Sequence, residues 1–450
     1  MKIIEFTNIS QLRSDIFAAG LVDYVAVKLT GREIYYDANC FIRMEQVAID
    51  LEAAMVFSGY RLLDSDGRLE EVPSIEYQPG SFRDDFDFGG VVLLNTYDVL
   101  AALSEMNVDD VSRQCDGGWY ALRLSLSIDR MIGQIPEILY TMVKTDYRHS
   151  GQKQHDYVKA DNYTSQLEKY TTFIQYLERL NALTGNKKKL NYNDTSLDSD
   201  KNFPVEMSVV IPVRNRVQTI ADAVHSALEQ QLDSPFNIIV VDNDSDDGTR
   251  EILESLEAEN SRVKLIKVSK AEGLGIGGCW NRAVTSEFCG RFAVQLDSDD
   301  LYSRPDTLRL IHEKFMETGA AVVVGTYRMT DFDLNLIPPG IISHSEWNDT
   351  FGADNALRLN GFGAPRAFYT PVLRSILFPN VSYGEDYAVM LRISREYAVG
   401  RLFEPIYNCR RWNGNSDSHL PIEKVNEHNF YKDFLRSYEF LARMANRGGE

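Results

Sequence analysis

A run of three carboxylates is the first feature of this sequence that could do chemistry. Asp297 ends RFAVQLD, an apolar stretch with the composition of a buried strand, and Asp299 and Asp300 follow it. Carboxylates this close repel one another, so the pattern predicts a neutralising partner. A hard divalent cation such as Mg²⁺ or Mn²⁺ suits the role, because it takes one or two carboxylates together with substrate phosphates. A solvated turn that caps a helix is the alternative for this segment taken alone.

Two further acidic segments have the same ambiguity. VVDNDSDDGT, residues 240–249, follows an apolar run, and its Asp and Asn side chains could bind ribose hydroxyls or a base N–H. Asp247 or Ser245 could equally cap the helix that follows. GEDYAVMLRIS opens another helical pattern with Glu385 and Asp386, where acidic residues also complement the helix dipole. The sequence of either segment alone leaves both interpretations open.

The elements that must position these segments alternate between strand and helix patterns. Alternation of this kind predicts an α/β fold with a mainly parallel sheet, whose ligands bind beyond the carboxyl ends of the strands. The acidic segments lie at those ends. The predicted strands span residues 207–213, 236–242, 263–269, 291–297 and 320–328, and the helices between them span 219–230 and 249–259.

Taken together and in order, five segments resemble the family 2 glycosyltransferases with the GT-A fold. They are SVVIPVRNR, VVDNDSDDGT, GGCWNRA, QLDSDDLYSRPD and GEDYAVMLRIS. The resemblance covers about residues 204–418 and implies a Rossmann-like GT-A catalytic domain, with a mainly parallel sheet flanked by helices. It also implies transfer of a sugar, with inversion, from a nucleotide sugar to a hydroxyl acceptor such as a glycan or glycolipid. Mn²⁺ or Mg²⁺ would be the cofactor, and UDP would carry the sugar, as is commonest in the family.

The resemblance assigns a role to each matching position. Asp386 is the expected general base, and Glu385 is expected to bind or position the acceptor. Asp299 would bind the metal, and His419 would complete the metal site. The expected nucleotide-sugar contacts are Pro212, Arg214, Asn215, Asp242, Asn243, Asp297, Arg410 and Arg411. Asp300 would support them, and Asn243 departs from the Asp that the family often has there.

The length of 450 residues predicts two domains. Residues 204–450 are expected to form the GT-A catalytic domain, ending in a C-terminal helix. The polar stretch 184–203 is expected to be an exposed linker. Residues 1–183 are expected to form an α/β domain that resembles the acceptor half of GT-A.

An internal repeat supports this expectation for the N-terminal domain. The order of motifs from Ala53 onward repeats the order from Ala320 onward, which indicates duplication. The first copy is predicted to be degenerate and catalytically silent. YYDANC keeps only Asp37 of the acidic segment, and Gly118-Trp119 stands where Glu385-Asp386 should recur.

The amino-acid composition restricts the classes of partner that the protein is expected to bind. A formal net charge of -19 disfavours nucleic acid, and it requires a cation or a cluster such as Arg410-Arg411 for an anionic nucleotide. Five scattered cysteines without a CxxC motif favour a reducing, cytoplasmic location. The sequence shows no signal-peptide pattern and no apolar run long enough to span a bilayer. Peripheral membrane contact and homo-oligomer formation stay open.

The sequence leaves two alternative functions open. GLGIGG, residues 273–278, satisfies the GxGxxG pattern of a dinucleotide-dependent enzyme, which would bind NAD without a metal. A non-catalytic, glycan-binding or scaffolding pseudo-glycosyltransferase is the second rival. It would bind a nucleotide sugar without turning it over.

Overall fold

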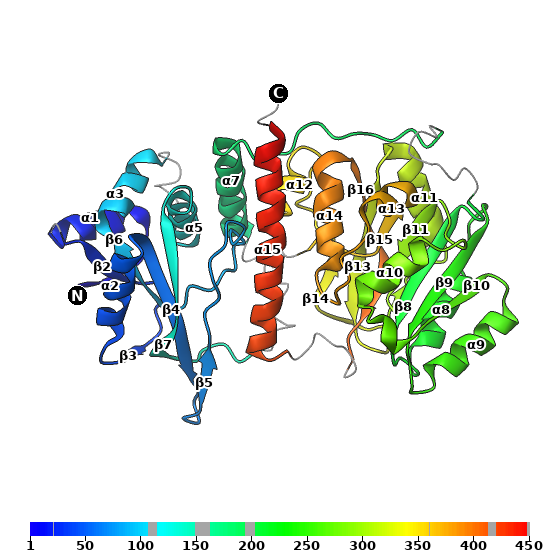
Figure 1. Cartoon of the computed structure of the whole chain (residues 1–450), viewed down its shortest axis with the longest axis horizontal. Helices are drawn as coiled ribbons and strands as arrows, with labels where there is room; N and C mark the ends of the chain where they lie inside the picture. Colours follow the sequence, from blue (N-terminus) through cyan, green and yellow to red (C-terminus); the bar gives the residue numbers. More distant parts are fainter. Residues whose placement is uncertain are drawn as a thin grey trace. The chain divides into compact units, whose positions relative to one another are not determined.

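The chain forms two compact units. The computed structural model describes residues 1–20, 22–106, 115–148, 163–193, 203–359, 361–412 and 420–447. Unit 1 contains residues 1–183, 357–360 and 416–450, and unit 2 contains residues 184–356 and 361–415 (Figure 1). Each unit has its own sheet, and helices accompany both sheets, which confirms the predicted α/β fold class.

The sheet of unit 2 has the strand order β10-β9-β8-β11-β15-β13-β16-β12, and β14 pairs with β13. Strands β10, β9, β8 and β11 are mutually parallel, whereas β15 is antiparallel to both of its neighbours. The strands are β8 (Met207–Val213), β9 (Phe236–Asn243), β10 (Val263–Val268), β11 (Phe292–Gln295), β12 (Leu301–Tyr302), β13 (Val322–Thr330), β14 (Leu336–Ile342), β15 (Arg366–Tyr369) and β16 (Val399–Arg410).

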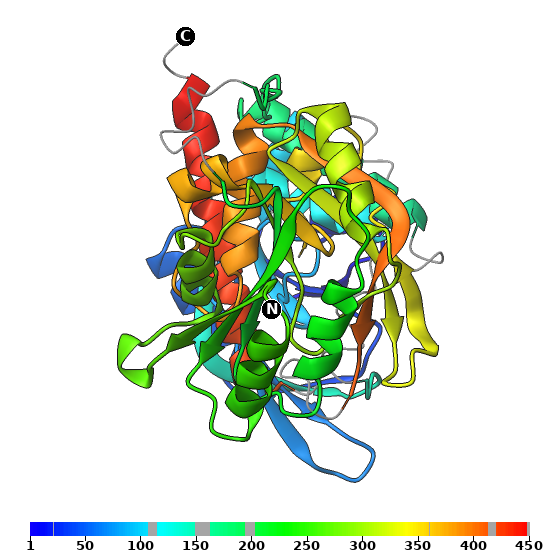
Figure 2. The ribbon, with the colours of Figure 1, turned by 90° about the vertical axis from the view of Figure 1, so that its right-hand side faces the viewer.

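Helices lie on both faces of this sheet, and the green strands nearest the viewer in Figure 2 have green helices on either side. Because helices cover both faces of the sheet, β8 and β9 are apolar runs that are buried along almost their whole length. The carboxyl ends of the parallel strands therefore hold the polar residues. The helices are α8 (Ile220–Leu228), α9 (Thr249–Glu259), α10 (Ile276–Val284), α11 (Thr307–Thr318), α12 (Gly352–Asn355), α13 (Thr370–Ile376) and α14 (Glu385–Glu396), with a 3₁₀ turn at Lys270–Glu272.

Unit 1 contains a sheet with the order β1-β2-β6-β4-β7-β3, and β5 pairs with β4. Two clusters of buried apolar side chains form its core. The strands are β1 (Ile3–Glu5), β2 (Tyr24–Lys28), β3 (Ile34–Tyr36), β4 (Ala53–Leu63), β5 (Leu69–Val72), β6 (Val91–Asn95) and β7 (Met131–Val143). The helices are α1 (Ile9–Ala18), α2 (Cys40–Asp50), α3 (Thr96–Glu105), α5 (Cys115–Leu126), α7 (Tyr163–Arg179) and α15 (Ile422–Arg447).

The two sheets share one topology over six strands. In unit 1, β1-β2-β6-β4-β7-β3 pair in turn parallel, antiparallel, antiparallel, parallel and antiparallel. In unit 2, β8-β11-β15-β13-β16-β12 pair in the same sequence of directions. The added hairpin strands, β5 on β4 and β14 on β13, also correspond. Unit 2 differs by the two further parallel strands β9 and β10.

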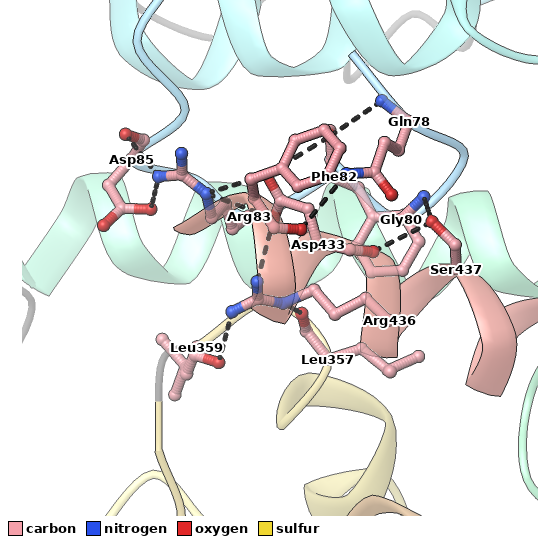
Figure 3. A network of polar contacts seen from close by, with 12 residues as sticks. Gln78, Gly80, Phe82, Arg83, Asp85, Leu357, Leu359, Asp433, Arg436 and Ser437 are labelled. Atoms are coloured by element: carbon pink, nitrogen blue, oxygen red, sulfur yellow. Dashed lines mark hydrogen bonds and ion pairs between the residues drawn. The ribbon is translucent and has the colours of Figure 1, made fainter. Parts of the chain in front are cut away.

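The C-terminal helix belongs to unit 1, which corrects the predicted boundary of the catalytic domain at residue 450. Its Asp433 is fully buried and pairs with Arg83, at 3.2 Å, and with Arg436, at 2.9 Å (Figure 3). Figure 1 shows α15 beside α7, and the rings of Tyr176 and Phe440 stack between the two helices. The amphipathic pattern of α15 predicts that one face is buried, but not which unit buries it.

The first part of the predicted linker is packed structure. The backbone of Lys188 pairs with Tyr397 beside β16, and the backbone N–H of Leu190 donates to Gly319. The Tyr192 hydroxyl donates to the carbonyl of Ala320 at 2.6 Å. Residues 184–193 therefore belong to unit 2 rather than to an exposed linker, and 194–202 lie outside the described residues.

Candidate functional site

The loop between β11 and β12 holds the three predicted carboxylates at the carboxyl end of a central strand. Burial, together with the neighbouring charges of Asp297 and Asp299, raises the pKa of Asp300 well above its usual value. Burial also raises the pKa of Asp297, and the Asp299 charge adds to that shift. The loop therefore concentrates negative charge in a desolvated place, as its sequence predicted.

Arg410, at the end of β16, is the main cation of this loop. Its backbone N–H donates to Asp300 at 2.8 Å, its Nε donates to the Asp299 carbonyl at 2.5 Å, and its Nη1 pairs with Asp222 at 3.1 Å. Nη2 of the same guanidinium is buried and has no hydrogen-bond partner among the described residues. A buried donor without a partner is costly, so Nη2 is a candidate contact for a ligand oxygen. Arg411 lies beside it and donates its backbone N–H to Thr330.

Asp299 faces two more donors. The Trp412 indole Nε1 donates to its Oδ2 at 3.3 Å, and the Arg216 guanidinium lies 3.8 Å from the same oxygen. These contacts join the end of β16 and the loop after β8 to the acidic loop. Trp412 and Arg216 were not predicted from the sequence, although Trp412 directly follows the predicted Arg410-Arg411 pair.

The acidic pair Glu385 and Asp386 forms the first turn of α14 and lies near Asp297. Asp386 pairs with Arg366 on β15 at 2.7 Å. Glu385 Oε2 is buried without a partner among the described residues, and burial raises the pKa of this carboxyl to about 8, with the Asp386 charge contributing. The charge of Asp297 contributes as well, so the structure brings the predicted base and the acidic loop together.

The predicted nucleotide pocket is built from the ends of β8 and β9. Asn215 has a positive φ of 53°, donates its backbone N–H to Ser245 at 2.9 Å and accepts from the Asp246 N–H at 3.0 Å. Asn243 donates to the Leu274 carbonyl at 2.9 Å. These contacts hold the two loops against each other. Pro212 lies within β8, and Arg214 is exposed beyond its end.

Asp242 has a structural role that its sequence position did not indicate. It is fully buried, pairs with Arg250 on α9 at 2.6 Å and accepts from the Ser245 N–H at 3.2 Å. Both of its oxygens therefore hold the loop to the start of α9. Its direct contact with a base or ribose stays a prediction.

The glycine-rich segment serves packing rather than phosphate binding. The Gly277 N–H donates to the carbonyl of Val381 at 3.0 Å, and the Gly275 N–H donates to Asn380 at 2.8 Å. A Cβ on Gly277 would stand 2.0 Å from the Pro379 carbonyl oxygen. The amides that a dinucleotide would need are thus occupied by residues 379–381, which removes the main support for that rival function.

The carboxylates of the site suit a metal ion that is coordinated largely by the phosphates of a bound substrate. Across the described ranges, no three His, Cys, Asp or Glu side chains are arranged as a metal site. Mg²⁺ and Mn²⁺ need only one or two carboxylates when phosphates complete their coordination. The Asp299 side chain is 15% exposed and lies beside the carboxylates of Asp297 and Asp300. His419, the other predicted ligand, lies outside the described residues.

Gln295 and Tyr407 complete the site and were missed by sequence reasoning. Gln295 Nε2 donates to Asp297 at 2.9 Å, and the Tyr407 hydroxyl accepts from the Asp297 backbone N–H at 3.0 Å. Gln295 ends β11 and Tyr407 lies within β16, and a single residue of either kind in a strand carries no spacing signal. Arg366 was missed for the same reason.

The segment that carries this site is similar to known proteins. Residues 208–376 match the family model described as glycosyl transferase family 2. The putative teichuronic acid biosynthesis glycosyltransferase TuaG of Bacillus subtilis is 33% identical over 120 residues, which cover 27% of this chain and 46% of TuaG. Chondroitin synthase of Escherichia coli is 35% identical over 136 residues, 30% of this chain and 19% of the synthase. The chain thus spans less than half the length of either relative.

Solved structures give a weaker likeness. Staphylococcus aureus TarS 1–349 in complex with UDP-GlcNAc has a TM-score of 0.41 and 18% identity, covering 53% of this chain and 72% of that one. No helix in the described parts of the chain is both long and apolar enough to cross a membrane. Residues 208–376 are thus similar to glycosyl transferase family 2, and the acidic loop lies within the matched segment.

Proposed function

We propose that unit 2 transfers a sugar from a UDP-sugar to a hydroxyl group of a glycan or glycolipid, with inversion and with Mn²⁺ or Mg²⁺. The observation that carries the proposal is the approach of the acidic pair on α14 to the acidic loop after β11. A cation-binding carboxylate and a general base at one edge of the sheet are the two groups that a single displacement needs. Two relatives are named for polysaccharides, teichuronic acid and chondroitin, which supports a glycan acceptor.

The residues of this chain have distinct tasks in the proposed reaction. Asp386 accepts the proton of the attacking hydroxyl, and Glu385 orients the acceptor beside it. Asp297 contacts the ribose or the donor sugar, and the buried Nη2 of Arg410 binds a diphosphate oxygen as the leaving group gains charge. Asp299 would hold the metal ion, which supplies positive charge for the diphosphate when bound. One displacement at the anomeric carbon forms the new C–O bond and breaks the bond to the diphosphate.

Release of nucleoside diphosphate tests the proposal. The full chain is incubated with Mn²⁺, a panel of nucleotide sugars and a panel of glycan acceptors, and the free diphosphate is measured. Release with one nucleotide sugar, lost with EDTA and in Asp386→Asn, is expected. If a nucleotide sugar binds but no acceptor leads to release of the diphosphate, the non-catalytic glycan-binding function would be favoured instead.

We also propose that unit 1 is a degenerate copy of the same fold and does not bind the donor. Its matching strand order supports this, and its described residues contain no counterpart of the two strands, β9 and β10, that carry part of the predicted nucleotide pocket. The strand order places residues 29–33, LTGRE, at the position of 296–300, LDSDD, rather than the predicted YYDANC. Thr30 and Arg32 then stand where Asp297 and Asp299 stand in unit 2.

The position that corresponds to the base is also altered in unit 1. Trp119 on α5 replaces the carboxylate and packs its ring against Phe6, at 5.7 Å, and Phe88, at 5.9 Å. An indole in an aromatic core neither accepts a proton nor binds a cation through oxygen. We therefore assign all transfer chemistry to unit 2.

Free thiols support a reducing compartment, and we propose a cytoplasmic location. Among the described residues, Cys40, Cys279 and Cys289 are buried free thiols. Thiols persist where glutathione and thioredoxin keep them reduced.

A further inference from the structure

Arg366 is the first residue of β15 and lies among apolar neighbours. Its side chain is only 15% exposed, and Ala367 and Phe368 after it are fully buried. A guanidinium in such a place needs partners, because burying an unpaired charge is costly. Its Nη2 pairs with Asp386 at 2.7 Å and its Nη1 donates to the Gly363 carbonyl at 2.8 Å. The side chain therefore joins α14 to the strand.

Three carboxylates surround this guanidinium. Burial alone would lower the pKa of Arg366, but the charges of Asp386, Asp297 and Glu385 outweigh burial and raise it. One permanent cation thus faces both the predicted base and the first carboxylate of the acidic loop. Arginine suits this place because it stays charged and presents several donors in a fixed plane.

A second link runs through the backbone of the same residue. The Arg366 N–H donates to Gln295 Oε1 at 3.2 Å, and Gln295 Nε2 donates to Asp297 Oδ1 at 2.9 Å. Gln295 ends β11, whose Val294 pairs with Ala367 in the antiparallel ladder to β15. Tyr302 fixes Gln295 further, since its hydroxyl donates to the Gln295 carbonyl at 2.9 Å. One amide side chain therefore ties Arg366 to Asp297.

Asp386 is held at both oxygens. Arg366 contacts Oδ2, and the backbone N–H of Tyr387 donates to Oδ1 at 2.6 Å. These two contacts fix the rotation of the Asp386 carboxylate.

The geometry points to Arg366 and Gln295 as positioning residues that set the place of the base on α14 relative to the donor-binding Asp297 on β11. The assignment rests on the proposed function of unit 2. The contacts run from Asp297 through Gln295 and Arg366 to Asp386. The paired strands β11 and β15 and the first turn of α14 hold these residues in place. Proton transfer depends steeply on this placement, because a reacting group displaced by about 1 Å loses roughly 10²-fold in rate.

The test measures donor hydrolysis, in which water takes the place of the unidentified acceptor, for the full chain with Mn²⁺. For Arg366→Met we expect kcat to fall about 10²-fold with the donor KM changed by less than about twofold. Arg366→Lys keeps a charge near Asp386 but cannot also reach Gly363, so its kcat should fall roughly tenfold. Gln295→Leu frees Asp297 and should raise the donor KM as well as lower kcat.

Arg392→Met is the matched control. Arg392 lies two turns further along α14, is 42% exposed and pairs with Glu396, so kcat and KM should stay at the wild-type values. Melting temperatures are measured for all variants, and Arg366→Lys keeps the test informative if Arg366→Met does not fold. If Arg366→Lys and Gln295→Leu fold and keep wild-type kcat and KM, the positioning role is wrong and the proposed function stands. If the wild-type protein neither hydrolyses any nucleotide sugar nor transfers sugar from one, both the positioning role and the proposed function are wrong.

Discussion

Asp386 and Glu385 are neighbours on α14 and yet lie in different environments. Asp386 is partly exposed and ion-paired with Arg366, whereas Glu385 Oε2 is buried without a partner in the described structure. Burial keeps the proton on the Glu385 carboxyl to higher pH. A carboxyl that keeps its proton suits the proposed acceptor-positioning role of Glu385.

Replacement of Asp386 tests the first of these roles. Asp386→Asn keeps the size of the side chain but cannot take up a proton, so turnover should fall about 10²-fold to 10⁴-fold. Donor affinity should stay near the wild-type value, because the base acts only as the hydroxyl attacks. Kinetics of diphosphate release and a binding titration with the donor measure the two quantities. Turnover at the wild-type rate would remove Asp386 from the mechanism.

The buried carboxyl of Glu385 predicts a pH dependence of stability. Its pKa rises from the usual 4.5 to about 8, so the folded protein binds this proton more tightly than the unfolded chain does. The stabilising contribution is complete below the unfolded pKa and is lost as the pH rises through about 8. Between about pH 6 and pH 9 the melting temperature of the wild type should therefore fall more steeply than that of Glu385→Gln.

Glu251→Gln, at an exposed position on α9, is the control for this comparison. Its melting temperature should follow the wild-type curve across the same range. Parallel curves for the wild type and Glu385→Gln would show that the Glu385 carboxyl does not bind its proton more tightly on folding.

Residues that act as a group could be found in the sequence, and residues that act singly could not. The acidic loop and the α14 pair were predicted because several carboxylates at fixed spacing follow apolar runs. Arg366, Gln295 and Tyr407 lie alone within strands, and their role depends on which strand pairs with which. Pairing between β11 and β15 joins residues far apart in the chain, so no local pattern reports it.

At the scale of elements, the start of α10 shows how a motif can mislead. GLGIGG satisfies a dinucleotide pattern, but its glycines let residues 379–381 approach closely. Gly277 is the tightest of these positions. The contact holds α10 against the segment that leads into α14.

Gly277→Ala should therefore destabilise the protein. Its new Cβ would stand 2.0 Å from the Pro379 carbonyl oxygen, and overpacking of this kind costs about 1–3 kcal/mol. Gly361→Ala is the control, since no atom lies within 4 Å of its added Cβ. Denaturant unfolding of the two variants checks the difference. Equal stability would mean that segment 379–381 moves aside freely.

The C-terminal helix carries a second prediction at this scale. Asp433→Asn leaves Arg83 and Arg436 buried with their shared countercharge removed (Figure 3). Breaking a buried ion pair in this way costs about 3–5 kcal/mol. Glu427→Gln removes an exposed ion pair with Lys424 on the same helix and should cost about 0–1 kcal/mol. Unfolding of both variants by denaturant measures the contrast, and similar losses would contradict the role of Asp433.

The predicted elements match the structure best where burial is continuous. The strands at 207–213 and 236–242 became β8 and β9 with almost the same bounds, and helix 249–259 is α9. The short strands β12 and β15 have too few residues for a period to emerge. The sequence shows the helical pattern of α15, but the prediction that this helix belongs to the catalytic domain is wrong. A buried helix face does not identify the elements that cover it.

At the scale of the whole molecule, one topology occurs twice and the chemistry is assigned once. Unit 2 carries the acidic loop and the proposed base, whereas we place LTGRE and Trp119 of unit 1 at the corresponding positions. The chain should therefore bind one donor molecule, not two. Calorimetric titration should give a stoichiometry of about one, because a second site would need a second set of ligands. A stoichiometry near two would show that unit 1 has kept a donor site.

Donor binding to Asp299→Ala tests the central claim most directly. Thermal stability of the wild type and this variant is measured against a panel of nucleotide sugars and NAD, with Mn²⁺, with Mg²⁺ and with EDTA. A ligand that binds only the folded state raises the melting temperature by mass action. We predict a shift with one nucleotide sugar that requires the metal and is lost in Asp299→Ala. No shift with any nucleotide sugar at saturating concentration, or a shift with NAD alone, would contradict the account.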